Sequence, residues 1–524
     1  MSHVRPDSPL RADEPNRAGA FPDLAVRAGR RGRRHHHGRH ATGLGDGFGS
    51  VVSWTLIGAL IPGAGLVAAG RRILGRVLLA IVLLAVAAGV VFAVRSNPLQ
   101  AAARVVASPD MLLRVAIGLA VLILLWVVVV VLTHVSLRRR VRLNRGQRML
   151  AGALVTSLVL AGALPTLEAA HYALVARDTV QSVFAPNQDK LSEGANRPGT
   201  TADPWAGVPR VNVLLIGSDA GKGREGVRPD TLILASIDTA SGETTLFSLP
   251  RNLQHVPFPP GSRAQKAFPR GFYCINPQNG VNTECLLNAV WSWAEGNPQY
   301  YPGVKNPGLT ATVQAVEQVL GLQVDDYVMV NLKGFITFVD AIGGVRLNIT
   351  ERLPIGGSVE NPQPKYGWIE PGRNKLLDGW HALWYARSRW STNDFDRMRR
   401  QRCVIAAVTR QADPKAVALN FDKIARAAKD NISTDISVRD LNAWVTLALR
   451  IKQAHVRSLP LTDAVINTVK PDIPKIHRLV RRALDPANTA TPAPTPTATG
   501  GKTPKPTPSP EGETGRPVDV NQVC

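Results

Sequence analysis

A dense cluster of arginines is the part of the chain best suited to do chemistry, and it occupies residues 385–402, YARSRWSTNDFDRMRRQR. Its six arginines are accompanied by only two acids, Asp394 and Asp396, and apolar sequence flanks the cluster on both sides. Guanidinium groups repel one another inside a fold unless an anion compensates their charge, and their planar donors match phosphate oxygens. The cluster is therefore either a solvated basic face or the binding site of an oligophosphate.

Two carboxylates upstream are placed where they could complete such a site. Asp219 ends the apolar run VNVLLIGSDA, which is typical of a buried strand that delivers a polar loop. Asp230 precedes the next predicted strand, TLILASID, and Arg251 follows a third, ETTLFSLP. If Asp219 and Asp230 pair, they supply hard oxygen ligands for Mg²⁺ or Mn²⁺, which could also hold a pyrophosphate. Each carboxylate alone is also consistent with a turn or capping role.

The second half of the cluster is predicted to be helical, which sorts its side chains by face. Arg397, Arg400 and Gln401 share one face at i, i+3 and i+4, close to the helix N-terminus, where anions are favoured. Arg399 and Arg402 lie off that face, so we expect them to be exposed to solvent and dispensable.

The basic residues outside this helix are also candidates for the phosphate site. An extended backbone at residues 387–389 would aim the side chains of Arg387 and Arg389 the same way. Arg228 either pairs with Asp230 or reaches the phosphate. A single arginine after a strand, such as Arg251, is more often an ordinary surface residue.

The elements that must position these residues indicate an α/β domain with a central mixed sheet, because strands alternate with helices. The later strands are expected at residues 326–332 and 343–350. The helices are expected at residues 310–322, 333–343, 378–387, 396–411, 421–429 and 438–451.

Apolar segments long enough to span a membrane precede this domain. The spans are expected at residues 74–94, 115–135 and 149–172. Residues 51–70 are also apolar but are interrupted by Pro62 and Gly63, so they form either a fourth span or an interfacial hairpin. Three spans put the arginine-rich segments at 71–76 and 138–148 on the cytoplasmic side. We therefore prefer three spans in a multi-pass plasma-membrane protein with its folded domain outside the cytoplasm.

Composition divides the whole chain into five parts. These are a disordered basic cytoplasmic N-terminus (1–48), a membrane region (49–175), a linker (176–207), the α/β domain (208–475) and a disordered Thr/Pro-rich tail (486–524). The net charge is +23, but much of the excess lies in the N-terminus and between apolar segments, which argues against a nucleic-acid partner. The four cysteines lack the spacing of a zinc site.

Six fragments of the domain together resemble the LytR-CpsA-Psr family of cell-wall glycopolymer ligases. The fragments are LLIGSDA (214–220), RPDTLILASID (228–238), SLPRNL (248–253), FITFVDAIGGV (335–345), LLDGWHALWYARSR (376–389) and DFDRMRRQR (394–402). They occur in the family's order, and the resemblance covers residues 208–475. It implies an α/β/α catalytic domain with a long apolar pocket for a lipid, and helices 310–322 and 333–343 either line that pocket or form ordinary core.

The resemblance also implies an activity and the residues that carry it. A member of this family transfers a glycopolymer phosphate from a polyprenyl-pyrophosphate carrier to a peptidoglycan hydroxyl, with a divalent cation. We expect Asp219 and Asp230 to hold Mg²⁺ or Mn²⁺. The pyrophosphate would be bound by basic residues and one amide, with Arg251, Arg389 and Arg397 also catalytic: Arg228, Arg251, Arg387, Arg389, Arg397, Arg400 and Gln401. Asp230, Asp394 and Asp396 are the candidates for the general base.

The chain departs from the family pattern at residues 274–276, and this segment contains one of its four cysteines. Many members carry Lys-Ile-Asn where this chain has Cys274-Ile275-Asn276, which removes a cation that Arg270 or Lys266 could replace. Outside the cytoplasm, Cys274 and Cys285 are expected to form a disulfide. Whether Cys403 and Cys524 pair is left open by the sequence.

Two other functions use the same residues. A polyprenyl-pyrophosphate pyrophosphatase would use the same clamp with water as the acceptor. A non-catalytic, wall-glycan-binding or regulatory membrane protein would only dock an anionic polymer, but simple docking does not require Asp219 and Asp230.

Overall fold

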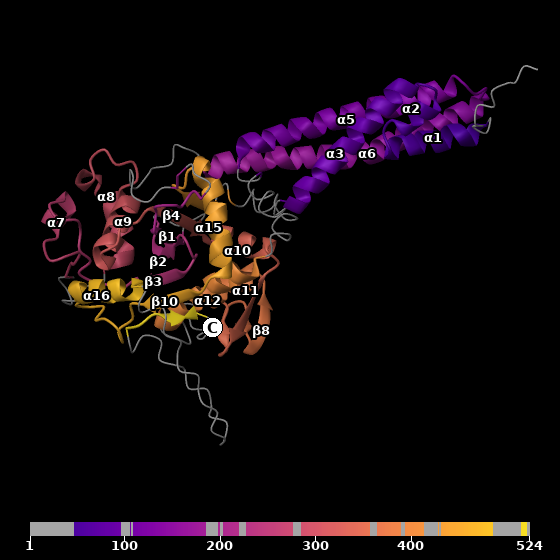
Figure 1. The fold of residues 1–524 in the computed structure, drawn as a ribbon. Helices are drawn as coiled ribbons and strands as arrows, with labels where there is room; N and C mark the ends of the chain where they lie inside the picture. Colours follow the sequence, from indigo (N-terminus) through magenta and orange to yellow (C-terminus); the bar gives the residue numbers. More distant parts are fainter. Residues whose placement is uncertain are drawn as a thin grey trace, which may run out of the picture.

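A computed structural model describes two connected parts of the chain, a bundle of long helices and an α/β domain (Figure 1). The described residues are 47–95, 105, 108–184, 198–199, 203–219, 227–275, 284–356, 364–388, 394–412, 428, 431–485, 515–520 and 524. The predicted basic N-terminus and most of the predicted helix at 421–429 lie outside them.

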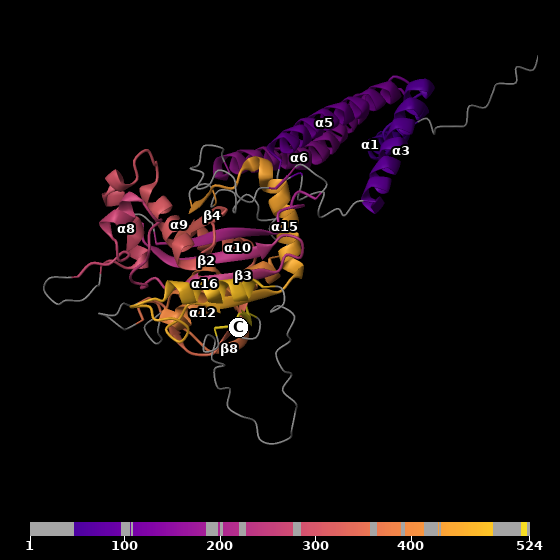
Figure 2. The same ribbon diagram turned by 60° about the vertical axis from the view of Figure 1, so that its left-hand side comes forward.

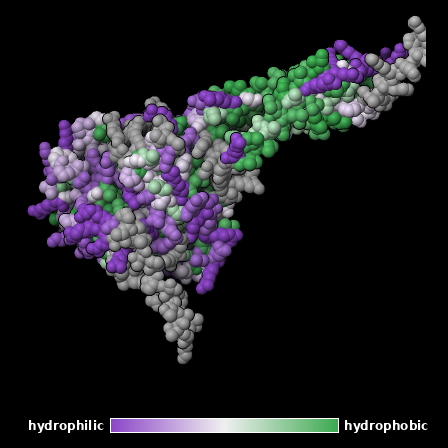
Figure 3. Space-filling model, in the orientation of Figure 1, coloured by the Kyte–Doolittle hydropathy of each residue, from purple (hydrophilic) through white to green (hydrophobic). Residues whose placement is uncertain are grey.

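In the described part of the chain, three helices are long and apolar enough to cross a membrane. They are α3 (Arg72–Arg95), α5 (Pro109–Arg138) and α6 (Arg145–Val183), and they cover the three predicted spans. Their apolar surface extends away from the domain in Figure 3. The segment 51–70 forms two short helices, α1 (Phe48–Leu60) and α2 (Ala64–Ala68), separated by a turn.

Helix α6 runs further than the sequence suggested, into the segment predicted to be a linker (176–207). The extension is stabilised by packing, since Val180 shares a buried cluster with Ile436 and Leu441 of the α/β domain. A hydrogen bond of 2.9 Å between the side chains of Asn442 and Ser108 adds a second contact. The domain therefore rests directly against the ends of α5 and α6.

The domain is built on a central mixed sheet, as predicted, and this sheet has seven strands in the described part of the chain. The strand order is β11-β10-β3-β2-β1-β4-β9. The strands are β1 (Arg210–Ser218), β2 (Pro229–Asp238), β3 (Thr244–Leu249), β4 (Asp326–Asn331), β9 (Ile432–Thr434), β10 (Val456–Pro460) and β11 (Val518–Asp519). β1 is parallel to β4, and β10 is parallel to β3. β2 is antiparallel to both β1 and β3. The strands β1, β3, β4 and β10 therefore end at the same edge of the sheet.

Helices cover both faces of the sheet, which confirms the α/β/α architecture. Leu214 and Ile216 of β1 pack toward one face, with α8 (Val290–Gly296), α9 (Pro307–Leu320) and α16 (Ile473–Leu484). Figure 2 shows α16 lying beside β3. Val211 and Val213 alternate with them and pack toward the other face, where α15 (Leu441–Gln453) lies.

The remaining elements are short or belong to a small lobe beside α12 (Asp394–Gln411). The small lobe consists of α10 (Leu332–Ala341), β5 (Val345–Ile349), β6 (Leu353–Pro354), β7 (Trp368–Ile369), β8 (Gly372–Leu377) and α11 (Gly379–Arg387). The other short elements are α7 (Arg263–Ala267), η1 (Leu287–Ala289), η2 (Pro298–Tyr300) and η3 (Val438–Asp440).

The prediction of a disordered tail over 486–524 is wrong at its end. Strand β11 pairs antiparallel with β10, Val520 is fully buried, and Cys524 forms a disulfide with Cys403 of α12. The Thr/Pro-rich composition that suggested disorder stops before this final segment, whose valines suit an edge strand. The predicted disulfide between Cys274 and Cys285 is also present.

Candidate active site

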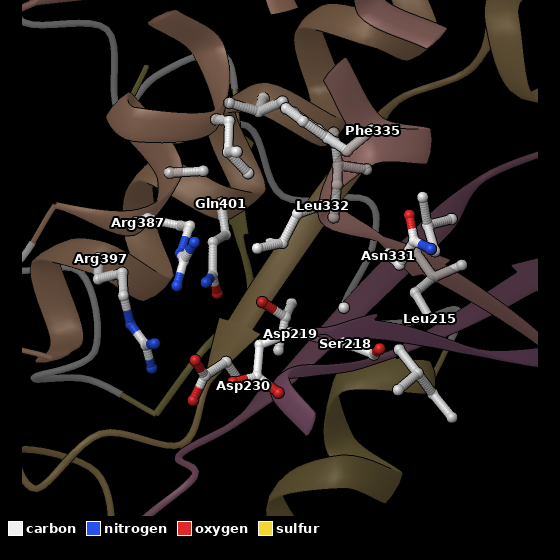
Figure 4. Close-up of a pocket in the computed structure, with 18 of the residues that line it drawn as sticks. Leu215, Ser218, Asp219, Asp230, Asn331, Leu332, Phe335, Arg387, Arg397 and Gln401 are labelled. Carbon is white, nitrogen blue, oxygen red and sulfur yellow. The ribbon is translucent and has the colours of Figure 1, made fainter. Parts of the chain in front are cut away.

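A cavity of about 230 Å³ lies where β1 and β4 end, between the sheet and α10, α11 and α12 (Figure 4). Most of its wall is apolar, and its charged side chains gather at one end. The apolar residues include Leu215, Val328, Val330, Leu332, Phe335, Leu383, Val404 and Ile405. The polar residues include Asp219, Asp230, Arg387, Arg397 and Gln401. The cavity therefore suits a ligand with an apolar body and a charged head.

The two predicted carboxylates meet at the charged end because of how β1 and β2 pair. Gly217 lies opposite Thr231 and Ser218 lies opposite Pro229, so the register shift leaves Asp230 without a partner residue on β1. Asp230 and Asp219, the residue just after β1, both line the cavity. Gly217 permits this close pairing, since a Cβ there would lie only 2.9 Å from Cβ of Thr231. Figure 4 shows both carboxylates at one end of the cavity.

Acids and arginines alternate along one edge of the site. Arg251, just after β3, donates a 2.9 Å hydrogen bond to Asp230, and its Nε lies 3.5 Å from Oδ1 of Asp394. Asp394 also lies 2.9 Å from Nη2 of Arg397. The carboxylate of Asp394 thus holds two guanidinium groups from different elements close to each other and to the cavity.

Three further predicted residues complete the polar end. Arg387, the last residue of α11, lies with its guanidinium 5.6 Å from the ring centroid of Trp384. Gln401 is one turn beyond Arg397 on α12 and is almost fully buried. Figure 4 shows Arg387, Arg397 and Gln401 on the helix side of this end, next to Asp219 and Asp230.

Arg400 was predicted to face the phosphate, and this placement is wrong. Its side chain is 1% exposed and does not line the cavity. It donates hydrogen bonds to the carbonyl oxygens of Tyr385 and Ser388 and lies 3.2 Å from a carboxylate oxygen of Glu351. Burial lowers the pKa of Arg400. Burial also raises the pKa of Glu351, and the nearby charge of Arg400 partly offsets that rise. Arg400 therefore anchors the C-terminal end of α11.

Arg402 is predicted to be exposed, but it is almost fully buried, because α12 packs on both the small lobe and the sheet. Arg399 is half-buried. Arg228 is exposed and does not line the cavity; its backbone N–H donates a 3.3 Å hydrogen bond to Asp219. Arg389 lies outside the described residues.

Sequence reasoning missed the part of the wall formed by the end of β4, which leads into α10. Asn331 lies opposite Ser218 in the parallel register and caps α10 by accepting a hydrogen bond from the backbone N–H of Gly334. Leu332 and Phe335 follow it into the cavity. The sequence contained a signal for this wall, because Asn331 lies at the end of a predicted strand. Neighbouring parallel strands place their last residues at the same edge of a sheet. Of the two helices considered for a lipid pocket, α10 lines the cavity and α9 belongs to the core on the opposite face.

The carboxylates fit a divalent cation that also binds phosphate. Within the described residues, no group of three or more His, Cys, Asp or Glu side chains could hold a metal alone. Two carboxylates nevertheless face one cavity, and Mg²⁺ usually takes one or two carboxylates together with waters and substrate phosphates. The donor set therefore matches Mg²⁺ better than a metal that requires a closed protein cage.

The fold and the cavity together define an α/β/α domain that follows three helices able to cross a membrane and that has a cavity with an apolar wall and a charged end. The LytR_cpsA_psr family model matches residues 185–475, more than half of the chain, and the protein belongs to this family.

Relatives with assigned names share the domain at low identity. The chain is 28% identical over 247 residues to biofilm regulatory protein A of Streptococcus mutans, covering 46% of this chain and 53% of the relative. It is 29% identical over 239 residues to the polyisoprenyl-teichoic acid–peptidoglycan teichoic acid transferase TagU of Oceanobacillus iheyensis, covering 45% and 62%. The chain thus spans about half to three fifths of the length of these relatives. The crystal structure of TagV from Bacillus subtilis aligns at 24% identity and a TM-score of 0.36, covering 54% of this chain and 98% of that one.

Proposed function

We propose that the protein is a phosphotransferase that moves a glycopolymer phosphate from a polyprenyl-pyrophosphate carrier to a hydroxyl of peptidoglycan. The observation that carries the proposal is the cavity itself, which joins an apolar wall to a cluster of carboxylates and guanidinium groups. A polyprenyl chain attached to a pyrophosphate has the same two parts. The name of the TagU relative from Oceanobacillus iheyensis describes a transfer of this kind.

The location of the domain supports a carrier that stays in the membrane. The end of α6 packs on the domain through Val180 and Phe184, and the same cluster includes Val328, which lines the cavity. The apolar wall is therefore near the membrane helices. We infer that the domain lies outside the cytoplasm in the plasma membrane, where peptidoglycan is accessible.

Charge balance supports a divalent cation as a partner of the substrate. The described part of the site contains three carboxylates, Asp219, Asp230 and Asp394, and three guanidinium groups, Arg251, Arg387 and Arg397, whose ordinary charges cancel. A pyrophosphate diester adds two negative charges. Asp219 and Asp230 would hold Mg²⁺ or Mn²⁺, and the bound ion would neutralise the charge that builds up on the phosphate oxygens.

The residues of the chain mainly position the reactants, as phosphoryl transfer requires. Arg251, Arg387 and Arg397 bind the pyrophosphate oxygens and keep the bridging bond beside the incoming hydroxyl. The acceptor oxygen forms a bond to the glycan-side phosphorus, the bridging P–O bond breaks, and its electron pair leaves with polyprenyl phosphate. The hydroxyl proton passes to a carboxylate.

A direct assay uses the full-length protein in detergent micelles, a polyprenyl-pyrophosphate donor with a radiolabelled glycan, peptidoglycan oligomers and Mg²⁺. Label is expected on the oligomer, and chelation of divalent ions should abolish the transfer. Asp230→Asn should lower the rate by about 100-fold or more. Glu370→Gln, which changes a surface carboxylate paired with Arg352, is the matched control and should retain full activity. Release of unattached glycan phosphate by the wild-type protein, with no labelled oligomer, would instead assign it as a pyrophosphatase.

A further inference from the structure

A second cleft, of about 520 Å³, lies outside the active-site cavity and has a different chemistry. Its walls come from the loop that follows β3 and from the loop that precedes α16. Aromatic and basic side chains line it, including His255, Tyr273, Arg270 and Lys470. An aromatic surface beside exposed cations is suited to a ligand with sugar rings and negative charges.

The aromatic part of this cleft is held in a costly backbone conformation. His255 has a φ of 51°, in the left-handed region that residues other than glycine rarely adopt. Its imidazole stacks on the ring of Tyr273, with the ring centroids 4.1 Å apart and the planes inclined by 13°. Such strain persists only where the surroundings fix it, and it is common at binding sites.

Several contacts fix this conformation. The ring nitrogen Nδ1 of His255 is 2.9 Å from the carbonyl oxygen of Arg270, and Gly271 allows the close approach because a Cβ there would lie 2.3 Å from the carbonyl oxygen of His255. The disulfide at Cys274 ties down the residue next to Tyr273. Gln254 donates a backbone hydrogen bond to Thr468, which joins the two loops. The cleft is thus built before any ligand arrives.

The cleft and the active site lie along the same edge of the sheet. β1 and β3 end at this edge, as does β10, and the sheet order places β10 and β3 beside β2 and β1. Arg251 of the active site and His255 of the cleft are four residues apart on one loop. A polymer bound in the cleft would therefore lie beside the cavity and not on the opposite side of the domain.

Positive charge continues beyond the cleft along α16. Its exposed face carries Arg478, Arg481 and Arg482, and the helix starts next to Lys470. Hydrophilic side chains dominate this end of the molecule in Figure 3. An extended chain with repeated negative charges would be attracted along the whole length of this surface.

We propose that the cleft binds the acceptor, a peptidoglycan strand, and so presents its hydroxyl to the active site. Sugar rings pack against the His255–Tyr273 pair, and the carboxylates of the peptide stems lie near Arg270, Lys470 and α16. This assignment rests on the proposed transferase function, but binding of the acceptor can be measured without any transfer.

The test measures sedimentation of the full-length protein in detergent with isolated peptidoglycan from which other glycopolymers have been stripped. The double variant Arg270→Glu/Lys470→Glu should bind about tenfold more weakly than the wild type. Tyr273→Ala should also weaken binding, and Tyr273→Phe should restore it because the ring face is retained. Arg373→Glu, an exposed charge reversal on β8, is the control and should bind like the wild type. In the transfer assay the KM for the acceptor should rise in the cleft variants while the KM for the donor stays constant.

Unchanged sedimentation of the double variant, or an absence of sedimentation by the wild type, would overturn the proposal. A raised KM for the donor with unchanged binding of peptidoglycan would also overturn it, because the cleft would then serve the donor glycan. If the cleft variants lose binding but the wild type transfers no glycan, the cleft assignment stands and the transferase proposal fails. Matching thermal unfolding curves confirm that each variant is folded.

Discussion

Arg397 and Arg400 lie one turn apart on α12, yet their surroundings give them different tasks. Arg397 lines the cavity and pairs with Asp394, which also contacts Arg251. Arg400 is buried against two carbonyl oxygens and Glu351. A charge at the first position can act on a bound anion, while a charge at the second stabilises the fold.

Replacing each of these arginines with methionine separates the two tasks. Arg397→Met should lower the rate of transfer by about 10²–10³-fold while the unfolding temperature stays nearly constant. Arg400→Met leaves buried acceptors without a donor and should destabilise the protein by about 3 kcal/mol, or roughly 10 °C in the unfolding temperature. Thermal unfolding and initial rates on the same preparations check both. A stable Arg400→Met variant without activity would contradict the anchoring role.

Asp394 is expected to be a positioning residue for the two arginines that it joins. Asp394→Asn weakens its hold on Arg251 and Arg397, so the KM for the donor should rise by roughly tenfold to a hundredfold. The kcat should change less than the KM. Initial rates over a range of donor concentrations give both constants, and a fall in kcat at constant KM would instead assign Asp394 a role in proton transfer.

At the scale of elements, helix periodicity predicted part of the site and missed part of it. The spacing i, i+4 correctly grouped Arg397 and Gln401 at the cavity, because both lie on the side of α12 that faces the sheet. The spacing i, i+3 placed Arg400 on the same face, although Arg400 does not line the cavity. Periodicity assumes one buried face and one exposed face, but α12 is covered by the sheet and by the small lobe, so Arg400 and Arg402 are both buried.

The apolar wall made by α10 and α11 should determine which carriers fit. Ala386 of α11 lines the cavity and is only half-buried, so Ala386→Phe would narrow the cavity with little strain on the core. We expect the KM for a long-chain polyprenyl donor to rise by about tenfold, and the KM for a short-chain analogue to change much less. Ala386→Ser is the matched control. Equal effects on both donors would argue against a chain bound in this cavity.

At the scale of the whole molecule, the last described residues of the chain pack back onto the α/β domain. The disulfide between Cys403 and Cys524 joins residues 121 positions apart and attaches the C-terminus to α12. Neither composition nor periodicity could predict this closure, because the partners of the last residues, β10 and Cys403, are far away in the sequence. The sheet core and the membrane helices were predictable because their patterns are local.

Loss of this cross-link should be visible as lower stability. Cys524→Ser should lower the free energy of unfolding by about 3–4 kcal/mol, because the unfolded chain becomes less constrained. Thermal unfolding without reductant gives the comparison with the wild type. The Cys274–Cys285 bond remains in the variant, so it serves as an internal control. An unfolding temperature equal to that of the wild type would mean that the closure contributes nothing to the fold.

The central claim is that the active site transfers a glycan phosphate to a sugar hydroxyl and not to water. Running the reaction in ¹⁸O-labelled water with the full-length protein, donor, peptidoglycan and Mg²⁺ separates the two outcomes by mass spectrometry of the products. A transferase gives a glycan–peptidoglycan phosphodiester and polyprenyl phosphate, both without ¹⁸O. A glycan phosphate or polyprenyl phosphate that contains ¹⁸O, with no phosphodiester formed, would contradict the claim.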